Sequence, residues 1–533
     1  MSTNYSNLIR RNIVRRAMVL ACMAVVSLNG CGKGDDKKST DPSATPQAAA
    51  PTPAPWDKTS AGEAAAVPAA APATATPNDQ FAKISQYGAS EYCSLASGAD
   101  GTLHAIYTDQ PDPYKGHYLY YRSSKDGGAT WSDPKNLSDD ETATPAAYCR
   151  VLFGGDGKVY AIWKYLECNN LDAAGGGGSG ELVYRVLDGG AWSSIVRLND
   201  KHHGVVSYFA AIGPDGKVNL VYSQGNLDID WLPMGAVNSA SANLIRQAVL
   251  NGPTPQIRDL ITPAPIPTRA QVDAAHAAGH DIPYEDQYAK ADGLWDLRGY
   301  ITADGSTHFI ADHQEPYPNP DSIGAWITYY DGKQLHKLHE YQKGDHETNY
   351  STPWTLLLDS HGKEHVIRIP FKAEKQVVRD YPVVNGALGD PVDIVGPDKP
   401  SGSISTWQAC GLSGGGMAVT ASISQKGGWA PDDLELYISN SNGDGKWSSP
   451  TKVTHNTDAG TGMSKGAITT STTYYPKFAE LATTKNGMGL IMVNTAHGVV
   501  GVNNAAVTGS GRVVTGLSSY SSDSPWVFYT KVQ

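Results

Sequence analysis

Four cationic side chains occupy positions that suit the binding of an anionic group. Arg150, Lys164, Arg298 and Arg368 each stand near the start or end of an apolar run that predicts a β-strand. A cation beside a carboxylate neutralises it, which makes the adjacent C–H more acidic. A proton acceptor and a proton donor would then complete a β-elimination. The candidate acceptors are His313 and His203, and the candidate donors are Tyr148 and Tyr208.

Aromatic residues recur about nine residues before a series of small turns. They suit a platform on which sugar rings stack, and the alternative is that they only fill a channel. The cations have an alternative as well, because local acids such as Asp296 could pair with them. The aromatic positions are Tyr92, Tyr148, Tyr208, Trp295, Trp354 and Trp407, of which Tyr92, Trp295 and Trp407, with Lys164 and Arg368, are the candidate substrate-binding residues.

The small turns define an internal repeat. An apolar, strand-like run follows most of them, and most spacings are roughly 53 to 60 residues, which indicates four short strands per repeat. A histidine follows three of the turn glycines at one repeat position (His104, His308 and His365), which favours a packing role. The turn glycines are Gly101, Gly157, Gly216, Gly305, Gly362, Gly415 and Gly487, so seven repeats are predicted.

One hairpin carries a specific motif, S-x-D-G-G-x-T-W, from Ser124 to Trp131. Asp126 can accept hydrogen bonds from its own turn, and the glycines supply positive φ. The motif resembles the Asp-box, or BNR repeat, of sialidase-like β-propellers. The resemblance implies an all-β fold, a seven-bladed β-propeller of four-stranded antiparallel blades. It also implies a structural role for the box residues Ser124, Asp126, Gly128 and Trp131.

Chain direction in such a propeller predicts where a site would lie. The turns between first and second strands and those between third and fourth strands share one end of the blades. The starts of first strands, the ends of second strands and the long insertions share the other end. Long loops on a rigid scaffold commonly carry function, so this second end is the expected site. The insertions are residues 165–180, 224–243, 263–293 and 313–323.

The N-terminal 80 residues differ in composition from the rest. Residues 1–30 have arginines followed by a short apolar run and end before Cys31, which predicts a lipoprotein signal peptide with Cys31 as the lipidation site. Residues 31–80 are the lipidated cysteine followed by an Ala/Pro/Thr-rich segment that predicts a disordered linker. Residues 81–533 are the predicted β-propeller domain. Export permits a disulfide, for which Cys149 and Cys168 are candidates.

The net charge of −11 disfavours nucleic acid as a partner, because phosphate binding needs a basic surface. The expected partners are an acidic polysaccharide or glycoconjugate and the membrane, through a lipid on Cys31. The expected location is the cell envelope, at the outer membrane if the host is Gram-negative. We expect a monomer. No cofactor is indicated, and the cysteine spacing does not favour a metal site.

Three functions remain open on this sequence. The first is a lyase that cleaves uronate polymers, and the second is a sialidase-like glycoside hydrolase. A sialidase-like RIP sequence occurs at Arg368, but it falls in a late repeat and in a second strand. The third is a non-catalytic propeller that binds glycan or protein in the envelope, because propellers carry many functions.

Overall fold

The structure, a computed structural model, is built almost entirely of antiparallel β-strands. The chain divides into residues 1–70 and 71–533. All described residues lie in the second unit. They are residues 82–87, 90, 92–111, 117–138, 146–166, 180–199, 204–224, 244–252, 254–262, 270, 273–274, 277–279, 293–314, 322–342, 354–359, 361–370, 376–412, 416–426, 434–441, 445–453, 472–484, 487–500, 505–507, 513–515 and 520–532.

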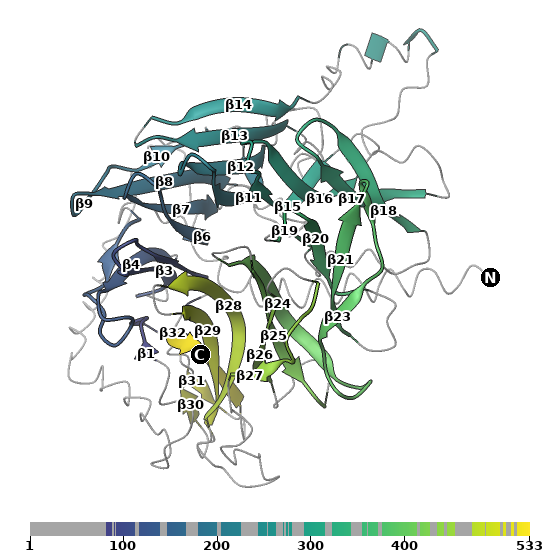
Figure 1. The fold of residues 1–533 in the computed structure, drawn as a ribbon. Coiled ribbons are helices and arrows are strands. Elements are labelled where there is room, and N and C mark those ends of the chain that lie inside the picture. The colour runs from purple at the N-terminus through teal and green to yellow at the C-terminus, as the bar shows by residue number, and fades with distance from the viewer. Residues whose placement is uncertain are drawn as a thin grey trace, which may run out of the picture. The chain divides into compact units, whose positions relative to one another are not determined.

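The N-terminal half of this unit contains three sheets (Figure 1). The first contains β2 (Cys93–Ser97), β3 (Leu103–Asp109), β4 (Tyr118–Ser124) and β5 (Lys135–Asn136). The second has nine strands: β6 (Ala146–Phe153), β7 (Val159–Leu166), β8 (Gly180–Asp188), β9 (Ala191–Trp192), β10 (Val196–Arg197), β11 (Val205–Ile212), β12 (Val218–Gln224), β13 (Leu244–Leu250) and β14 (Gln256–Ile261). The third contains β15 (Gly293–Ile301), β16 (Thr307–Gln314), β17 (Ser322–Tyr330) and β18 (Leu335–Gln342).

The remaining sheets follow the same antiparallel pattern. One contains β19 (Thr355–Leu358), β20 (Glu364–Arg368), β21 (Val378–Val384), β22 (Ala387–Leu388) and β23 (Val392–Val395). The next contains β24 (Ser403–Gly411), β25 (Met417–Ser424), β26 (Glu435–Ser441) and β27 (Thr451–Lys452). The last large sheet contains β28 (Thr472–Thr484), β29 (Gly487–Val500), β32 (Tyr520–Val532) and β1 (Ala82–Lys83), and a separate pair contains β30 (Ala505–Val507) and β31 (Val513–Thr515).

The nine-stranded sheet is two meanders joined at one position. Strands β6, β7 and β8 pair in order, and β11 to β14 pair in order, while Val205 of β11 pairs with Gly180 of β8. The last large sheet joins the two ends of the unit, because Ala82 of β1 pairs with Tyr529 of β32.

Successive sheets pack face to face, and five apolar clusters each lie between one sheet and the next. One cluster joins β3 and β4 to β6 and β7 through residues such as Leu119 and Trp163, both fully buried. Second strands such as β12 and β25 are buried along their whole length, because a neighbouring sheet covers each of their faces. This explains why the runs after the turns are largely apolar.

The first strands of successive sheets also touch one another. Contacts link β2 with β6, β6 with β11, β11 with β15, β15 with β19, β19 with β24 and β24 with β28. Strand β28 in turn contacts β2, and Figure 1 shows the yellow β28 beside the blue first sheet. Residues far apart in the sequence therefore meet where these strands begin.

The predicted turns and strands are confirmed where the structure describes them. Gly101, Gly157, Gly216, Gly305 and Gly362 all have positive φ, and a strand follows each turn. At the first turn, Asp100 accepts a hydrogen bond from the Thr102 amide (2.9 Å), which closes the turn on itself. Gly415 lies outside the described residues, as do two of the three residues of the turn at Gly487. Among the described residues, no helix is long and apolar enough to span a membrane.

The Asp-box hairpin has the hydrogen bonds that its sequence suggests. Ser124 Oγ donates to Asp126 Oδ1 (2.8 Å) and accepts from the Gly128 amide (2.8 Å). Asp126 Oδ1 also accepts from the Thr130 amide (2.9 Å), and Trp131 Nε1 donates to the Gly128 carbonyl (3.2 Å). Bonds from Thr130 and Ser124 hold the pKa of Asp126 below its usual value. The motif therefore positions a hairpin, and its side chains are occupied within the turn.

Replacing Ser124 by alanine is expected to destabilise the protein without affecting any site on the other end of the sheets. Ser124 is buried, and its loss leaves the Gly128 amide without its acceptor, which costs about 1 to 2 kcal/mol. Urea unfolding of S124A measures the change. Ser132→Ala is the control, because Ser132 Oγ also accepts from a backbone amide, that of Ser123 (3.0 Å), but at an exposed position where water can replace it. Equal urea midpoints for the two variants would contradict this role.

Candidate functional site

Two first strands carry the same β-bulge, and each bulge ends on an arginine. In β6 the register with β7 shifts between Ala147 and Arg150, and in β15 the register with β16 shifts between Trp295 and Arg298. The bulges contain Tyr148 (φ 51°) and Asp296 (φ 53°), two of the three non-glycine residues with positive φ in the described chain. Such conformations cost roughly 1 to 2 kcal/mol each and concentrate at functional sites. Each bulge changes the direction in which the side chains after it point.

Strand β11 lies between these two bulges and holds both. The Tyr208 hydroxyl donates to the Tyr148 carbonyl, and the Ser207 hydroxyl accepts from the Leu297 amide (2.9 Å). Tyr208 itself is buried. Its hydroxyl proton is therefore used to fix the Tyr148 backbone, so Tyr208 positions Tyr148 and is not available as the predicted proton donor.

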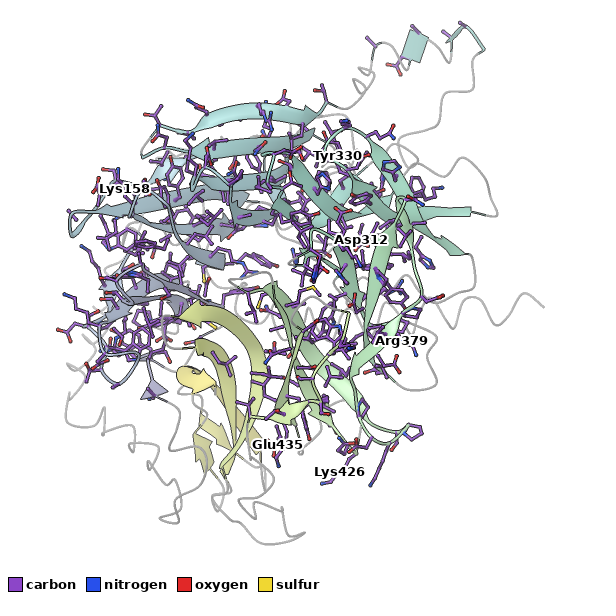
Figure 2. The ribbon with its side chains drawn as sticks, viewed as in Figure 1. Lys158, Asp312, Tyr330, Arg379, Lys426 and Glu435 are labelled. Carbon is purple, nitrogen blue, oxygen red and sulfur yellow. The ribbon has the colours of Figure 1, made fainter. Side chains whose placement is uncertain are left out.

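The two arginines lie within electrostatic range of each other. Burial lowers the pKa of Arg298, the positive charge of Arg150 lowers it further, and the carboxylates of Asp296 and Asp312 oppose this. Asp312 is on β16 beside the bulge, and Figure 2 shows it inside the set of sheets, whereas Lys158 lies at an outer turn. Two like charges held together in a partly buried site attract an anion.

Lys164 adds a third cation at the end of β7. Its side chain is buried, and its Nζ donates to the Val206 carbonyl (2.8 Å) and lies 4.7 Å from the centroid of the Tyr148 ring. Burial lowers the pKa of Lys164 to about 7, although the nearby Asp296 carboxylate opposes the shift. The charge of Lys164 therefore changes near neutral pH, directly behind Tyr148.

Tyr148 is the accessible member of this group. It is 40 % exposed, whereas Tyr208 is 8 % exposed, and its ring lies 4.8 Å from the ring of Tyr92 between centroids. We call Tyr92, Tyr148, Arg150, Lys164, Tyr208, Asp296, Arg298 and Asp312 the central cluster. An incoming ligand meets an aromatic pair with guanidinium groups beside it, an arrangement that suits an acidic sugar.

Three further predicted residues are described by their contacts. His313 follows Asp312 on β16 and so points to the opposite face, where its Nδ1 lies 3.0 Å from Thr328 Oγ1 and its ring contacts Trp326. Trp407 is buried in the core between β20 and β25. Arg368 is buried with its guanidinium carbon 3.8 Å from the centroid of the Trp354 ring. These contacts give His313 and Trp407 packing roles, which corrects their predicted site roles.

Other predicted site residues lie outside the described residues. His203, Cys31 and Cys168 are among them, as is the side chain of Trp295. Cys149 is buried in the cluster between β3 and β7. The predicted Cys149–Cys168 disulfide, the lipidation of Cys31, the signal peptide and the linker therefore stay predictions.

The sequence did not indicate Asp312 or Ser207 as members of this site, and it indicated Asp296 only as an acid that could pair with a cation. Asp296-Leu297-Arg298 has the same spacing as Tyr148-Cys149-Arg150, and both triplets precede a turn of the repeat. Aligning the repeats on their turn glycines would have placed Asp296 beside Tyr148. Ser207 gives no such signal, because its role depends on contact between separate strands. No group of histidine, cysteine and acidic side chains among the described residues could hold a metal ion.

No protein-family model and no curated protein matches the chain. Similar solved structures include the GH93 α-L-arabinofuranosidase of Fusarium graminearum in complex with arabinobiose (13 % identity, 82 % of this chain and 92 % of that chain, TM-score 0.35). They also include the α-L-arabinanase of Penicillium chrysogenum with arabinobiose (12 % identity, 70 % of this chain and 97 % of that chain, TM-score 0.37). A PL25 ulvan lyase is similar as well (13 % identity, 70 % of this chain and 82 % of that chain, TM-score 0.41). At these identities and TM-scores, no role is transferred from those proteins to this chain.

Proposed function

We propose that residues 82–532 form a closed seven-bladed β-propeller with four-stranded antiparallel blades. The chain of contacts between first strands, from β2 through β28 and back to β2, supports this arrangement. The pairing of β1 with β32 supports closure, because it joins both ends of the unit in one sheet. The Asp-box at Ser124–Trp131 favours a place among sialidase-like propellers.

We further propose that the central cluster acts on acidic glycans as a uronate polysaccharide lyase. One observation carries this proposal: Arg150, Arg298 and Lys164 surround the exposed Tyr148 on a protein whose net charge is −11. The central cluster contains three cationic side chains and two carboxylates, so one further negative charge would balance it. A uronate carboxylate supplies that charge.

The roles follow from the geometry. Arg150 and Arg298 bind and neutralise the carboxylate, which acidifies the proton on the neighbouring ring carbon. Tyr148 transfers that proton to the leaving glycosidic oxygen; the C–O bond breaks as the carbon–carbon double bond forms. Tyr92 stacks on a sugar ring, while Lys164 and Tyr208 position Tyr148 from behind. His203 keeps its predicted role as an alternative proton acceptor.

A non-catalytic glycan-binding propeller is the second candidate, because the same cations would hold an acidic sugar without turning it over. Export and lipid anchoring at Cys31 are part of both proposals and would place the site outside the cell. The sequence of residues 1–31 supports this location.

The test is to incubate the full chain with a panel of uronate polymers and to record the ultraviolet absorbance of the unsaturated product. We expect absorbance to rise on at least one polymer. Release of a saturated reducing sugar, without that absorbance, would identify a hydrolase instead. Binding without any product would establish the second candidate.

A further inference from the structure

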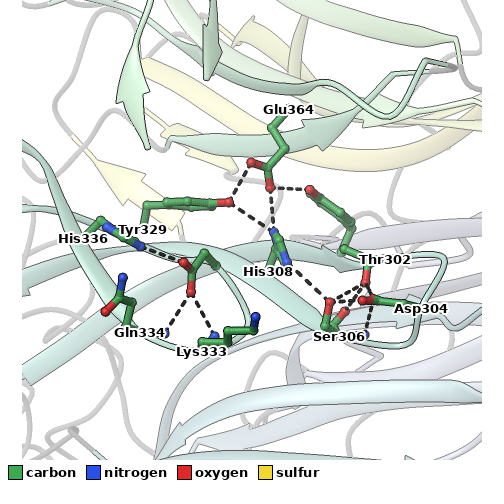
Figure 3. A network of polar contacts seen from close by, with 11 residues as sticks. Thr302, Asp304, Ser306, His308, Tyr329, Lys333, Gln334, His336 and Glu364 are labelled. Atoms are coloured by element: carbon green, nitrogen blue, oxygen red, sulfur yellow. Dashed lines mark hydrogen bonds and ion pairs between the residues drawn. The ribbon is translucent and has the colours of Figure 1, made fainter. Parts of the chain in front are cut away.

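A second group of reactive side chains lies at the opposite end of the sheets, at the turn before β16. Ser306 Oγ lies 3.4 Å from His308 Nε2, and His308 Nδ1 lies 2.7 Å from Glu364 Oε1 (Figure 3). Ser306 and His308 come from the turn and β16, whereas Glu364 comes from the next sheet. Hydroxyl, imidazole and carboxylate thus form a line in the order of a nucleophile, a base and an orienting acid.

Glu364 is held as a carboxylate. Burial opposes its charge, but hydrogen bonds from His308, Tyr300 and Tyr329 together keep the pKa of Glu364 below its usual value. Tyr329 donates to Glu364 Oε2 (2.6 Å), and Tyr300 donates to Oε1. Because Glu364 Oε1 accepts a hydrogen bond from His308 Nδ1, a neutral His308 takes the tautomer that carries its proton on Nδ1. The Nε2 lone pair then faces Ser306.

Ser306 is partly exposed and belongs to the Asp304 turn. Its Oγ lies 2.7 Å from Asp304 Oδ1 and 2.6 Å from Thr302 Oγ1 as well as near His308. Thr302 Oγ1 also donates to Asp304 Oδ1. The single proton of Ser306 can therefore turn from the Asp304 carboxylate to His308 Nε2 by rotation about one bond.

The first sheet offers a matched turn without the carboxylate. Thr102 occupies the position of Ser306 and bonds Asp100 (2.7 Å), and His104 occupies the position of His308. The Nδ1 of His104 lies 2.8 Å from the Tyr121 hydroxyl, and burial lowers the pKa of His104 to about 4. The shared turn is thus a structural element. The fifth repeat also pairs its histidine with a carboxylate, because His365 Nδ1 lies 2.8 Å from Asp380 Oδ1, but it has Lys363 at the position of Ser306. Of these three turns, the one in the fourth repeat combines a hydroxyl, an imidazole and a carboxylate.

A groove opens beside Ser306. Its volume is about 410 Å³, within the range for small ligands, and its lining is mostly polar. Thr307 Oγ1 is buried and has no hydrogen-bond partner in the described part of the chain. Arg258, Ser306, Thr307 and Tyr330 are among the residues that line this groove.

We propose that Ser306, His308 and Glu364 form a second active site, which hydrolyses a small ester of a hydroxyl-rich alcohol. Ser306 Oγ attacks the ester carbonyl while its proton passes to His308 Nε2. The bond to the alcohol oxygen breaks, and that oxygen takes the proton from Nε2. Water then attacks the acyl-serine, gives a proton to Nε2, and releases the carboxylic acid as Ser306 Oγ regains its proton. Glu364 holds the imidazole in orientation throughout.

The test is labelling of the full chain with a fluorophosphonate probe, followed by mass spectrometry of the modified peptide. We expect an adduct on Ser306 and hydrolysis of p-nitrophenyl acetate. His308→Gln and Glu364→Gln are expected to lower the labelling rate by about tenfold or more. His104→Gln is the matched control and should label as the unmodified protein does. Thermal unfolding of each variant identifies any that fail to fold.

Absence of an adduct on Ser306, or labelling that is equal in H308Q and H104Q, would overturn the proposal and leave a structural network. The two proposed sites are separable. Ser306→Ala should leave cleavage of uronate polymers unchanged, and Arg298→Ala should leave fluorophosphonate labelling unchanged. Loss of both activities in S306A with normal folding would also contradict a separate site.

Discussion

Replacing Arg298 by alanine is expected to lower kcat/KM on a uronate polymer by about 10²- to 10³-fold. Arg298 lies within electrostatic range of Arg150, Asp296 and Asp312. Its removal leaves two carboxylates with less positive charge, so the cluster would repel the uronate that it now attracts. Steady-state kinetics on the polymer that gives the largest absorbance change measures the effect.

Two variants make this result specific. Arg298→Lys keeps the charge but loses the planar pair of donors, so we expect it to recover only part of the activity. Arg246→Ala removes a partly exposed arginine of β13 that bonds Asp259 of β14 (2.9 Å), and it should retain full activity. Equal kinetics in R298A and R246A, with both variants folded, would show that the central cluster is not the site.

Replacing Lys164 by methionine is expected to stabilise the protein and weaken its action on uronates. The folded state holds the pKa of Lys164 near 7, whereas the unfolded chain has the usual value of about 10.4. Below pH 7 both states are protonated, and folding carries the full cost of burying the charge. Methionine has similar length and no charge. The gain in the free energy of unfolding at pH 6 should therefore be about 2 kcal/mol.

The pH dependence separates this effect from simple packing. Between pH 7 and about 10 the unfolded wild-type chain binds more protons, so wild-type stability rises with pH and the advantage of K164M shrinks. The same protonation adds a cation to the site at low pH, so wild-type kcat/KM should fall as pH rises through 7. K164M should lack that transition. Chemical unfolding and kinetics across this range test both points, and an identical pH profile in K164M would contradict them.

Much of the local structure could be predicted because it depends on neighbours in the sequence. The Asp-box needs only a serine, an aspartate and glycines within one hairpin, and each forms its hydrogen bonds there. The apolar runs after Gly157 and Gly216 predict strands because sheets cover both faces of β7 and β12. Chain direction in the repeat placed Arg150, Lys164, Arg298 and Arg368 at one end of the sheets, and this site assignment stays a prediction.

The roles of individual site residues could not be predicted in the same way. His313 and Asp312 are adjacent in the sequence, but side chains alternate between the two faces of β16. The Asp312 carboxylate therefore lies near Arg298, whereas the His313 imidazole contacts Trp326. Tyr208 is one residue away from the repeat position of Tyr148 when the repeats are aligned on Gly157 and Gly216, and its hydroxyl donates to the Tyr148 carbonyl. Glu364 carries no motif, and it meets His308 only because two sheets pack together.

The sequence alone therefore determined the turns, the strands and the repeat, because glycine conformation, local hydrogen bonds and hydrophobic periodicity act over a few residues. Tertiary structure alone decided which side chains share an environment, because bulges and packing between sheets set the direction of each side chain. That difference explains why burial brings the pKa of Lys164 to about 7, whereas Lys217 of the same chain stays about half exposed. The burial of such a side chain is a property of the folded chain, and the residues next to it in the sequence do not determine it.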